Sequence, residues 1–280
     1  MIRLKVWGSR GSIPVSGPGT EAYGGNTPCI HLTDGEGTHL VLDAGSGIRL
    51  LGSALLQQQP KRVDILLTHL HMDHIQGIGF FIPLYIPGLE IHIWGPASTT
   101  MRLWSRLARY MSPPLFPVRL RELPCNLALH EVPCGEFTIG SFTVNSQLIC
   151  HPGPTVGFRI QQGESVVTYI PDHEPALGAP TFPISADWTS GFALARNADL
   201  LIHDAQYSDE EYQRCIGWGH SSVRDACAFA RLAGARQLMP FHHDPAHTDS
   251  QLDAMAESAR NFCDGSFHVV EGKEGTELEL

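Results

Sequence analysis

Short apolar runs recur along the chain, and each ends in a turn rich in glycine, histidine or aspartate. Five segments share this pattern: 39–47 (HLVLDAGSG), 63–71 (VDILLTHLH), 165–173 (SVVTYIPDH), 199–206 (DLLIHDAQ) and 237–244 (QLMPFHHD). Continuous short apolar runs are typical of strands that are buried on both faces. We therefore expect five buried strands whose ends deliver polar side chains to one edge of a sheet.

Two other segments have the period of amphipathic helices. In 221–235 and 249–262 apolar residues recur every three or four positions, and Ser222 and Asp225 are spaced as a capping box at the start of the first. The stretch 137–149 (FTIGSFTVNSQLI) has the character of β-structure instead. Strands that alternate with helices predict a layered α/β fold.

Composition limits the class of protein. The chain has 280 residues, of which 42% are apolar and 17% charged, enough for one large core or two modest ones. It has no apolar run of about 18 residues and no signal-peptide core near its start, so we expect neither a membrane span nor export. Seven cysteines without a C-x-x-C pair suit reduced thiols, which predicts a cytoplasmic location.

The net charge of −10 disfavours nucleic acid as the default partner, because phosphate backbones attract clustered Lys and Arg. An acidic chain of this size is better suited to small molecules.

Segment 66–77 (LLTHLHMDHIQG) gathers His69, His71, Asp73 and His74 into six positions. In a helix, His69 and His71 would point to nearly opposite sides, whereas in an extended segment they face the same way. Two ligands at a strand end and two on the following turn can serve two adjacent ions. Imidazole and carboxylate together suit Zn²⁺, or Mn²⁺ and Fe in a harder site.

Three more candidate ligands follow other apolar runs: His151, Asp172 and His242. A carboxylate such as Asp172 can bridge two cations that share one hydroxide. A lone histidine is usually a core or surface residue. The dense motif is what makes a metal site the better interpretation of these three.

The order His69-x-His71-x-Asp73-His74, then His151, Asp172 and His242, resembles the ligand order of the metallo-β-lactamase superfamily, and the resemblance covers nearly the whole chain. It implies one domain, residues 1–280, folded as a four-layer αββα sandwich of two mixed β-sheets flanked by helices. It also implies two divalent metal ions, Zn²⁺ before Mn²⁺ or Fe. By family roles, one ion takes His69, His71 and His151, the other takes Asp73, His74 and His242, Asp172 lies between them, and Asp43 supports the metal loop.

Two segments indicate a branch of that superfamily. His203-Asp204-Ala205-Gln206 and Gly219-His220-Ser221-Ser222 resemble the His-Glu-Ala-Thr and Gly-His-Ser-Thr strings of ribonuclease Z and small phosphodiesterases. The aspartate and the glutamine of the first string depart from that pattern. His71 stands where flavin-linked diiron oxidoreductases have glutamate, and Asp172 stands where the common zinc β-lactamases have cysteine.

His220 is the candidate catalytic residue, with Asp204 and Asp73. It is expected immediately before a helix N-terminus, where an anion such as phosphate is favoured. An imidazolium there could hydrogen-bond a phosphoryl oxygen or protonate the leaving alkoxide, and Asp204 could orient it and raise its pKa. The alternative is an ordinary neighbour of a helix N-cap.

The resemblance leaves the substrate open. The basic arm with which ribonuclease Z grips transfer RNA has no counterpart here, so we expect a small phosphodiester, such as a cyclic nucleotide, hydrolysed by a hydroxide that the two ions share. Arg10 and Asn26 are candidate substrate contacts, although glycine-rich turns are an equal explanation. His243 and His247 are either partners of the metal ligands or surface residues. A homodimer is an open alternative to a monomer.

Three other functions remain. The same metal set could hydrolyse a carbonyl compound such as a thioester or lactone, or serve an RNA-processing nuclease related to ribonuclease Z. A metal-binding protein without turnover is the third, and the intact ligand set argues against it.

Overall fold

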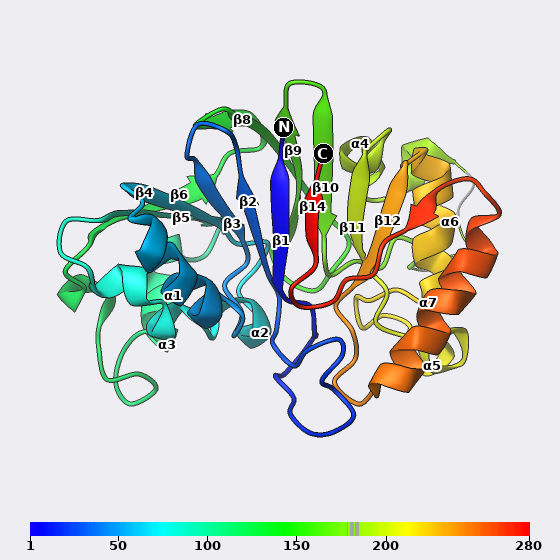
Figure 1. Ribbon diagram of the computed structural model, residues 1–280, viewed down its shortest axis with the longest axis horizontal. Helices are drawn as coiled ribbons and strands as arrows, with labels where there is room; N and C mark the ends of the chain where they lie inside the picture. Colours follow the sequence, from blue (N-terminus) through cyan, green and yellow to red (C-terminus); the bar gives the residue numbers. More distant parts are fainter. Residues whose placement is uncertain (178, 180–181, 183–184) are drawn as a thin grey trace.

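Two seven-stranded β-sheets pack face to face, and helices cover the outer face of each (Figure 1). The computed structural model describes residues 1–177, 179, 182 and 185–280. The four layers confirm the predicted αββα sandwich. The N- and C-terminal ends of the chain lie close together, because β14 pairs with β1.

The first sheet has the order β14-β1-β2-β3-β4-β5-β6. Its strands are β1 (Arg3–Gly8), β2 (Cys29–Thr33), β3 (His39–Leu42), β4 (Arg62–Leu66), β5 (Glu90–Pro96), β6 (Asn126–Val132) and β14 (Glu277–Glu279). Strands β3 to β6 run parallel to one another. Helices α1 (Ile48–Gln58) and α3 (Leu103–Tyr110) cover its outer face.

The second sheet has the order β13-β12-β11-β10-β9-β8-β7. Its strands are β7 (Gly135–Ile139), β8 (Phe142–Leu148), β9 (Val156–Gln162), β10 (Ser165–Ile170), β11 (Leu200–Asp204), β12 (Gln237–Phe241) and β13 (His268–Val269). Strands β10 to β13 are parallel. Helices α4 (Phe192–Ala195), α6 (Val223–Ala233) and α7 (Asp249–Cys263) cover it.

The five predicted strands are β3, β4, β10, β11 and β12, and the two predicted helices are α6 and α7. Ser222 caps α6 by accepting a hydrogen bond from the backbone N–H of Asp225. All five strands lie in the parallel parts of the two sheets. Their carboxyl ends therefore meet at one edge of the sandwich, where the polar residues that follow them collect.

The apolar side chains form three layers of core. One lies between the two sheets, and the others lie between each sheet and its helices. The proline-rich segment 111–124 is a loop apart from one short 3₁₀ turn. Met111 and Phe116 pack into the first helical layer, so only Leu115 of its large apolar side chains is well exposed. Within the described part of the chain, every helix is too short or too polar to cross a bilayer.

Candidate metal centre

The motif at 66–77 is extended first, as the spacing predicts, and the turn expected after it is a short helix. Strand β4 ends at Leu66, and His71 still has extended backbone angles (φ −64°, ψ 155°) where it caps the short helix α2 (Met72–Ile75). Asp73 and His74 lie on that helix, at the buried edge of the sandwich. The four side chains therefore converge from two short segments.

The structure brings all seven predicted metal ligands together in two adjacent groups. The potential ligand atoms of each group lie within 4.8 Å of one another. The first group is His69, His71 and His151, and the second is Asp73, His74, Asp172 and His242. The segments after β4, β8, β10 and β12 supply them, which explains how residues as far apart as His69 and His242 share one site.

Asp172 lies between the two groups. Its Oδ2 is 3.7 Å from Nε2 of both His69 and His151 in the first group. In the second group, the same oxygen is 3.4 Å from Nε2 of His242, and Oδ1 is 3.0 Å from Nε2 of His74. One carboxylate thus approaches both groups at once.

Four of the histidines are held from behind by their Nδ1 atoms. Nδ1 of His69 contacts Thr68 Oγ1 at 3.0 Å, and Nδ1 of His74 contacts Asp43 Oδ2 at 2.8 Å. Nδ1 of His151 contacts the backbone O of Gly219 at 2.7 Å, and Nδ1 of His242 contacts Gln206 Oε1 at 2.9 Å. Each contact leaves Nε2 facing the group. Histidines that bind metals in proteins are oriented in this way by an outer acceptor. His71 differs, because its Nδ1 is the atom that lies 3.3 Å from Nε2 of His151.

The donor set fits divalent metal ions. Nε2 of His69 is a buried polar atom without a hydrogen-bond partner among the described residues, a costly state unless another group binds it. Burial lowers the pKa of His69 well below its usual value, which keeps the ring neutral and its lone pair available. Burial opposes the charge of Asp172, but the histidines around it hold the pKa of its carboxyl well below the usual range.

Asp43 supports the second group from behind. Besides His74, it accepts hydrogen bonds from the backbone N–H and hydroxyl of Thr68 and from the hydroxyl of Tyr169 at 2.9 Å. It is fully buried and has a positive φ of 57°. Its carboxylate therefore ties the motif loop to β10 of the opposite sheet.

His220 lies beside both groups. Its ring is 4.9 Å from the ring of His242 and 5.1 Å from that of His151, and its Nδ1 is 2.7 Å from Asp204 Oδ2. Burial lowers the pKa of His220, but the Asp204 carboxylate outweighs that effect and raises the pKa to about 9. Helix α6 begins at Val223, so His220 lies three residues before it rather than directly at its start.

Arg10 is enclosed by protein in this structure. Its side chain is 0% exposed, and its guanidinium donates to the backbone carbonyls of Gly24, Asp244 and His247. Asn26 likewise has protein partners, since its amide donates to Glu274 and its carbonyl accepts from Ser46. Both side chains contact the loops around the site, and their role as substrate contacts stays a prediction.

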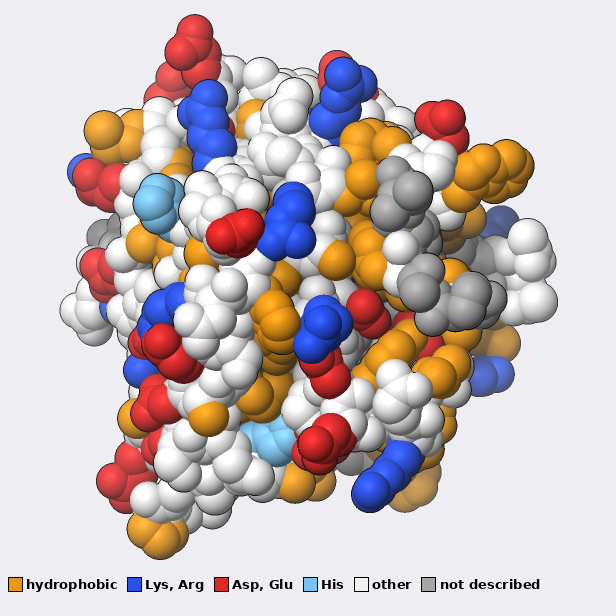
Figure 2. Space-filling view, turned by 90° about the vertical axis from the view of Figure 1, so that its right-hand side faces the viewer, with side chains coloured by type: hydrophobic (Ala, Val, Ile, Leu, Met, Phe, Trp, Pro, Cys, Tyr) orange, Lys and Arg blue, Asp and Glu red, His pale blue; other side chains and the backbone are white. Residues whose placement is uncertain are grey.

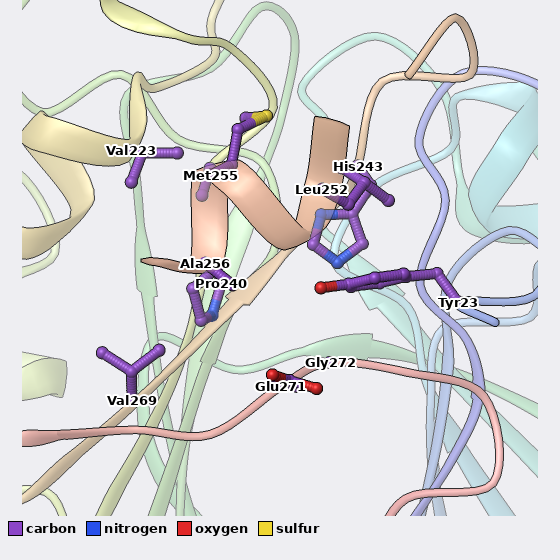
Figure 3. Close-up of a pocket in the computed structure, with 11 residues that line it drawn as sticks. Tyr23, Val223, Pro240, His243, Leu252, Met255, Ala256, Val269, Glu271 and Gly272 are labelled. Atoms are coloured by element: carbon purple, nitrogen blue, oxygen red, sulfur yellow. The ribbon is translucent and has the colours of Figure 1, made fainter. Parts of the chain in front are cut away.

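The side chains of His243 and His247 contact residues outside the two groups of potential metal ligands. Figure 3 shows His243 next to Tyr23 at one end of a mostly apolar pocket, with their ring centroids 5.3 Å apart. His247 contacts Glu211 through Nε2 at 3.0 Å. Neither histidine belongs to a group of side chains that could hold a metal among the described residues.

Several contacts of the site involve backbone atoms that no residue pattern identifies. The N–H of Ser12 donates to Asp73 Oδ2 at 2.8 Å, and the carbonyl of Gly219 fixes His151. Gly11 is packed so closely that an added Cβ would lie 2.4 Å from the ring of His242. Gln206 was visible in the sequence only as a departure from the ribonuclease Z pattern.

A Gln206→Leu variant tests the outer contacts. Removing the acceptor for His242 Nδ1 is expected to weaken metal binding about 10- to 100-fold, because the ring loses its fixed orientation. Competition with a chromogenic chelator measures this affinity. Gln162→Leu is the matched control, since Gln162 lies at the opposite end of the sheet and contacts Ser141. Equal affinity in the two variants would contradict the assigned role of Gln206.

Comparisons with known proteins agree with the fold. A family model described as the beta-lactamase superfamily domain matches residues 38–243. Ribonuclease Z from Myxococcus xanthus is 31% identical over 245 residues, which are 74% of this chain and 78% of that protein. The metallo-beta-lactamase fold protein YhfI from Bacillus subtilis has a TM-score of 0.74 at 20% identity and covers 100% of this chain and 99% of its own. A diphosphatase from the PhnP family has a TM-score of 0.69 at 17% identity, and the match covers 100% of this chain and 98% of the diphosphatase.

Proposed function

The chain belongs to the metallo-β-lactamase superfamily, and we propose that it is a metal-dependent phosphodiesterase that hydrolyses a small phosphodiester at a dinuclear site. The observation that carries the proposal is the place of His220, beside both groups of potential ligands and held by Asp204 at 2.7 Å. We further propose that residues 1–280 form one hydrolase domain.

The two groups of side chains would each hold one divalent ion, with Zn²⁺ favoured by the histidine-rich set. His69, His71 and His151 would bind the first, Asp73, His74 and His242 the second, and Asp172 both. Bound ions would supply the Lewis acidity that activates water for attack and stabilises negative charge on the phosphoryl oxygens.

His220 would act on the substrate directly. Because Nδ1 donates to Asp204, Nε2 is the nitrogen left to contact an oxygen of the phosphodiester. The water oxygen would form a bond to phosphorus and release a proton to solvent, while the bond to the leaving oxygen breaks. A proton from Nε2 would neutralise the departing alkoxide, and His220 would then regain a proton from solvent. The products are a phosphomonoester and an alcohol.

Charge supports a small substrate. The net charge is −10, and a long phosphate backbone would be repelled by such a protein. On the face in Figure 2, acidic and basic side chains are interspersed rather than gathered into one basic surface. A short phosphodiester requires no extended basic track.

The second candidate is RNA processing, which the similarity to ribonuclease Z favours. The two activities use the same chemistry and differ in the size of the substrate. Acidic charge is the feature of this chain that weighs against the larger one.

A substrate panel separates the two candidates. The metal-loaded protein is expected to hydrolyse cyclic nucleotides or linear dinucleotides faster, as kcat/KM, than transfer RNA precursors. The His220→Ala variant is the background control, because it removes the proposed chemistry without removing a proposed metal ligand. Cleavage of the RNA alone would overturn the small-substrate proposal and leave the nuclease.

A further inference from the structure

Glu174 is a buried carboxylate that has no part in the hydrolysis proposed for His220 and the metal ligands. It follows β10, two residues after Asp172, and only 1% of its surface is exposed. Its backbone N–H donates to the carbonyl of Cys150 at 2.9 Å, which fixes it beside the loop that carries His151. A buried acidic side chain is costly unless hydrogen bonds satisfy it.

The side chain of Glu174 has its partners on the helix and the loop that lead to His220. Oε1 accepts from the backbone N–H of Gly217 at 2.8 Å and from the hydroxyl of Tyr212 at 3.0 Å. Oε2 accepts from the backbone N–H of Gly219 at 2.7 Å. Tyr212 lies on helix α5 (Asp209–Cys215), so one carboxylate joins the end of β10 to α5 and to the loop after it.

Both the backbone N–H and the backbone carbonyl of Gly219 make hydrogen bonds. Glu174 accepts from its N–H, and its carbonyl accepts from Nδ1 of His151. Its φ is +91°, and an added Cβ would lie 2.3 Å from Pro152 and 2.6 Å from His151, so only glycine fits. The residue directly before His220 therefore has a fixed orientation, and Glu174 supplies one of the two bonds that fix it.

We propose that Glu174 is a positioning residue that sets the orientation of His220 through the backbone of Gly217 and Gly219. The proposal rests on the function proposed for His220. Asp204 holds the His220 ring, while Glu174 holds the chain from which that ring projects. Charge-assisted hydrogen bonds to two backbone N–H groups suit this role, because they hold the loop without occupying the site.

The Glu174→Gln variant tests the proposal with little change of shape. The glutamine amide accepts hydrogen bonds through one oxygen only. Either Gly219, or Gly217 and Tyr212 together, would therefore face the NH₂ group and lose the hydrogen bond to residue 174. The expected result is a fall in kcat of about 10- to 100-fold with KM nearly unchanged and metal content as in the wild type. Hydrogen exchange measured by mass spectrometry is expected to be faster in peptides that cover 215–221.

Two further variants control for a general loss of stability. Tyr212→Phe removes one donor to Glu174 and leaves both backbone bonds, so its kcat is expected to stay close to that of the wild type. Glu174→Asp keeps the charge but shortens the side chain, so it is expected to reproduce the faster exchange at 215–221 even if Glu174→Gln folds poorly.

A double-mutant cycle identifies the residue through which Glu174 acts. In a His220→Ala background, Glu174→Gln is expected to have almost no further effect on kcat. The same fold loss in both backgrounds, unchanged exchange at 215–221, or loss of bound metal would each overturn the proposal. The exchange measurement needs no substrate, and the cycle runs on whichever ester the wild type hydrolyses. A wild type inactive on phosphodiesters would therefore refute the proposed function and still leave Glu174 tested.

Discussion

An Asp172→Asn variant is expected to lose phosphodiester hydrolysis by on the order of a thousandfold or more, together with part of its bound metal. Asp172 is the carboxylate that approaches His69 and His151 on one side and His74 and His242 on the other. Asparagine keeps the shape but offers one oxygen and no charge, so it cannot neutralise two cations held close together.

Turnover of bis(p-nitrophenyl) phosphate and elemental analysis of the purified protein measure the two effects together. Asp199→Asn is the matched control, because Asp199 has hydrogen-bond partners at the opposite end of the second sheet. If Asp172→Asn kept about two ions per chain and wild-type turnover, the role proposed for Asp172 between the two ions would be refuted.

A His220→Ala variant is expected to lower phosphodiester turnover by on the order of a hundredfold or more while the metal content stays at the wild-type level. The imidazole contacts Asp204 through Nδ1, and the loss of Nε2 removes the group proposed to protonate the leaving oxygen. The loss of turnover should be smallest for substrates whose leaving group needs no proton. A series of phosphodiesters with differently substituted phenyl leaving groups would measure this dependence.

His268→Ala serves as the control for this variant, since His268 is an exposed histidine on β13. His220 also lies close enough to His151 and Asp172 to be a ligand itself. A variant that loses metal in proportion to activity would show that His220 binds an ion, and it would contradict the assigned role.

The positions of β3, β4, β10, β11 and β12 were predictable because their apolar runs are buried on both faces. The motif at 66–77 was predictable in shape as well, since alternate residues of an extended segment share a face and His69 and His71 do so here. His151, Asp172 and His242 are isolated in the sequence. Their convergence depends on parallel strands ending at one edge, and the family resemblance supplied the order in which they occur.

Apart from Asp43, which the family resemblance implied, the contacts behind the ligands could not be predicted, for two physical reasons. Burial decides whether a charged residue faces substrate or protein, and the sequence does not show that Arg10 is enclosed by three backbone carbonyls. Many of the contacts are also made by backbone groups, as at Ser12 and Gly219, which leave no residue-type signal. Glu174 belongs to the same class, because its partners are mainly the N–H groups of two glycines.

The most direct test of the proposed phosphodiesterase activity compares the metal-replete wild type on three substrates: bis(p-nitrophenyl) phosphate, a thioester and a lactone. We expect hydrolysis of the phosphodiester with the highest kcat/KM, loss of that activity on treatment with a chelator, and recovery when divalent metal is restored. Turnover of the thioester or the lactone without turnover of the phosphodiester would contradict the proposed activity.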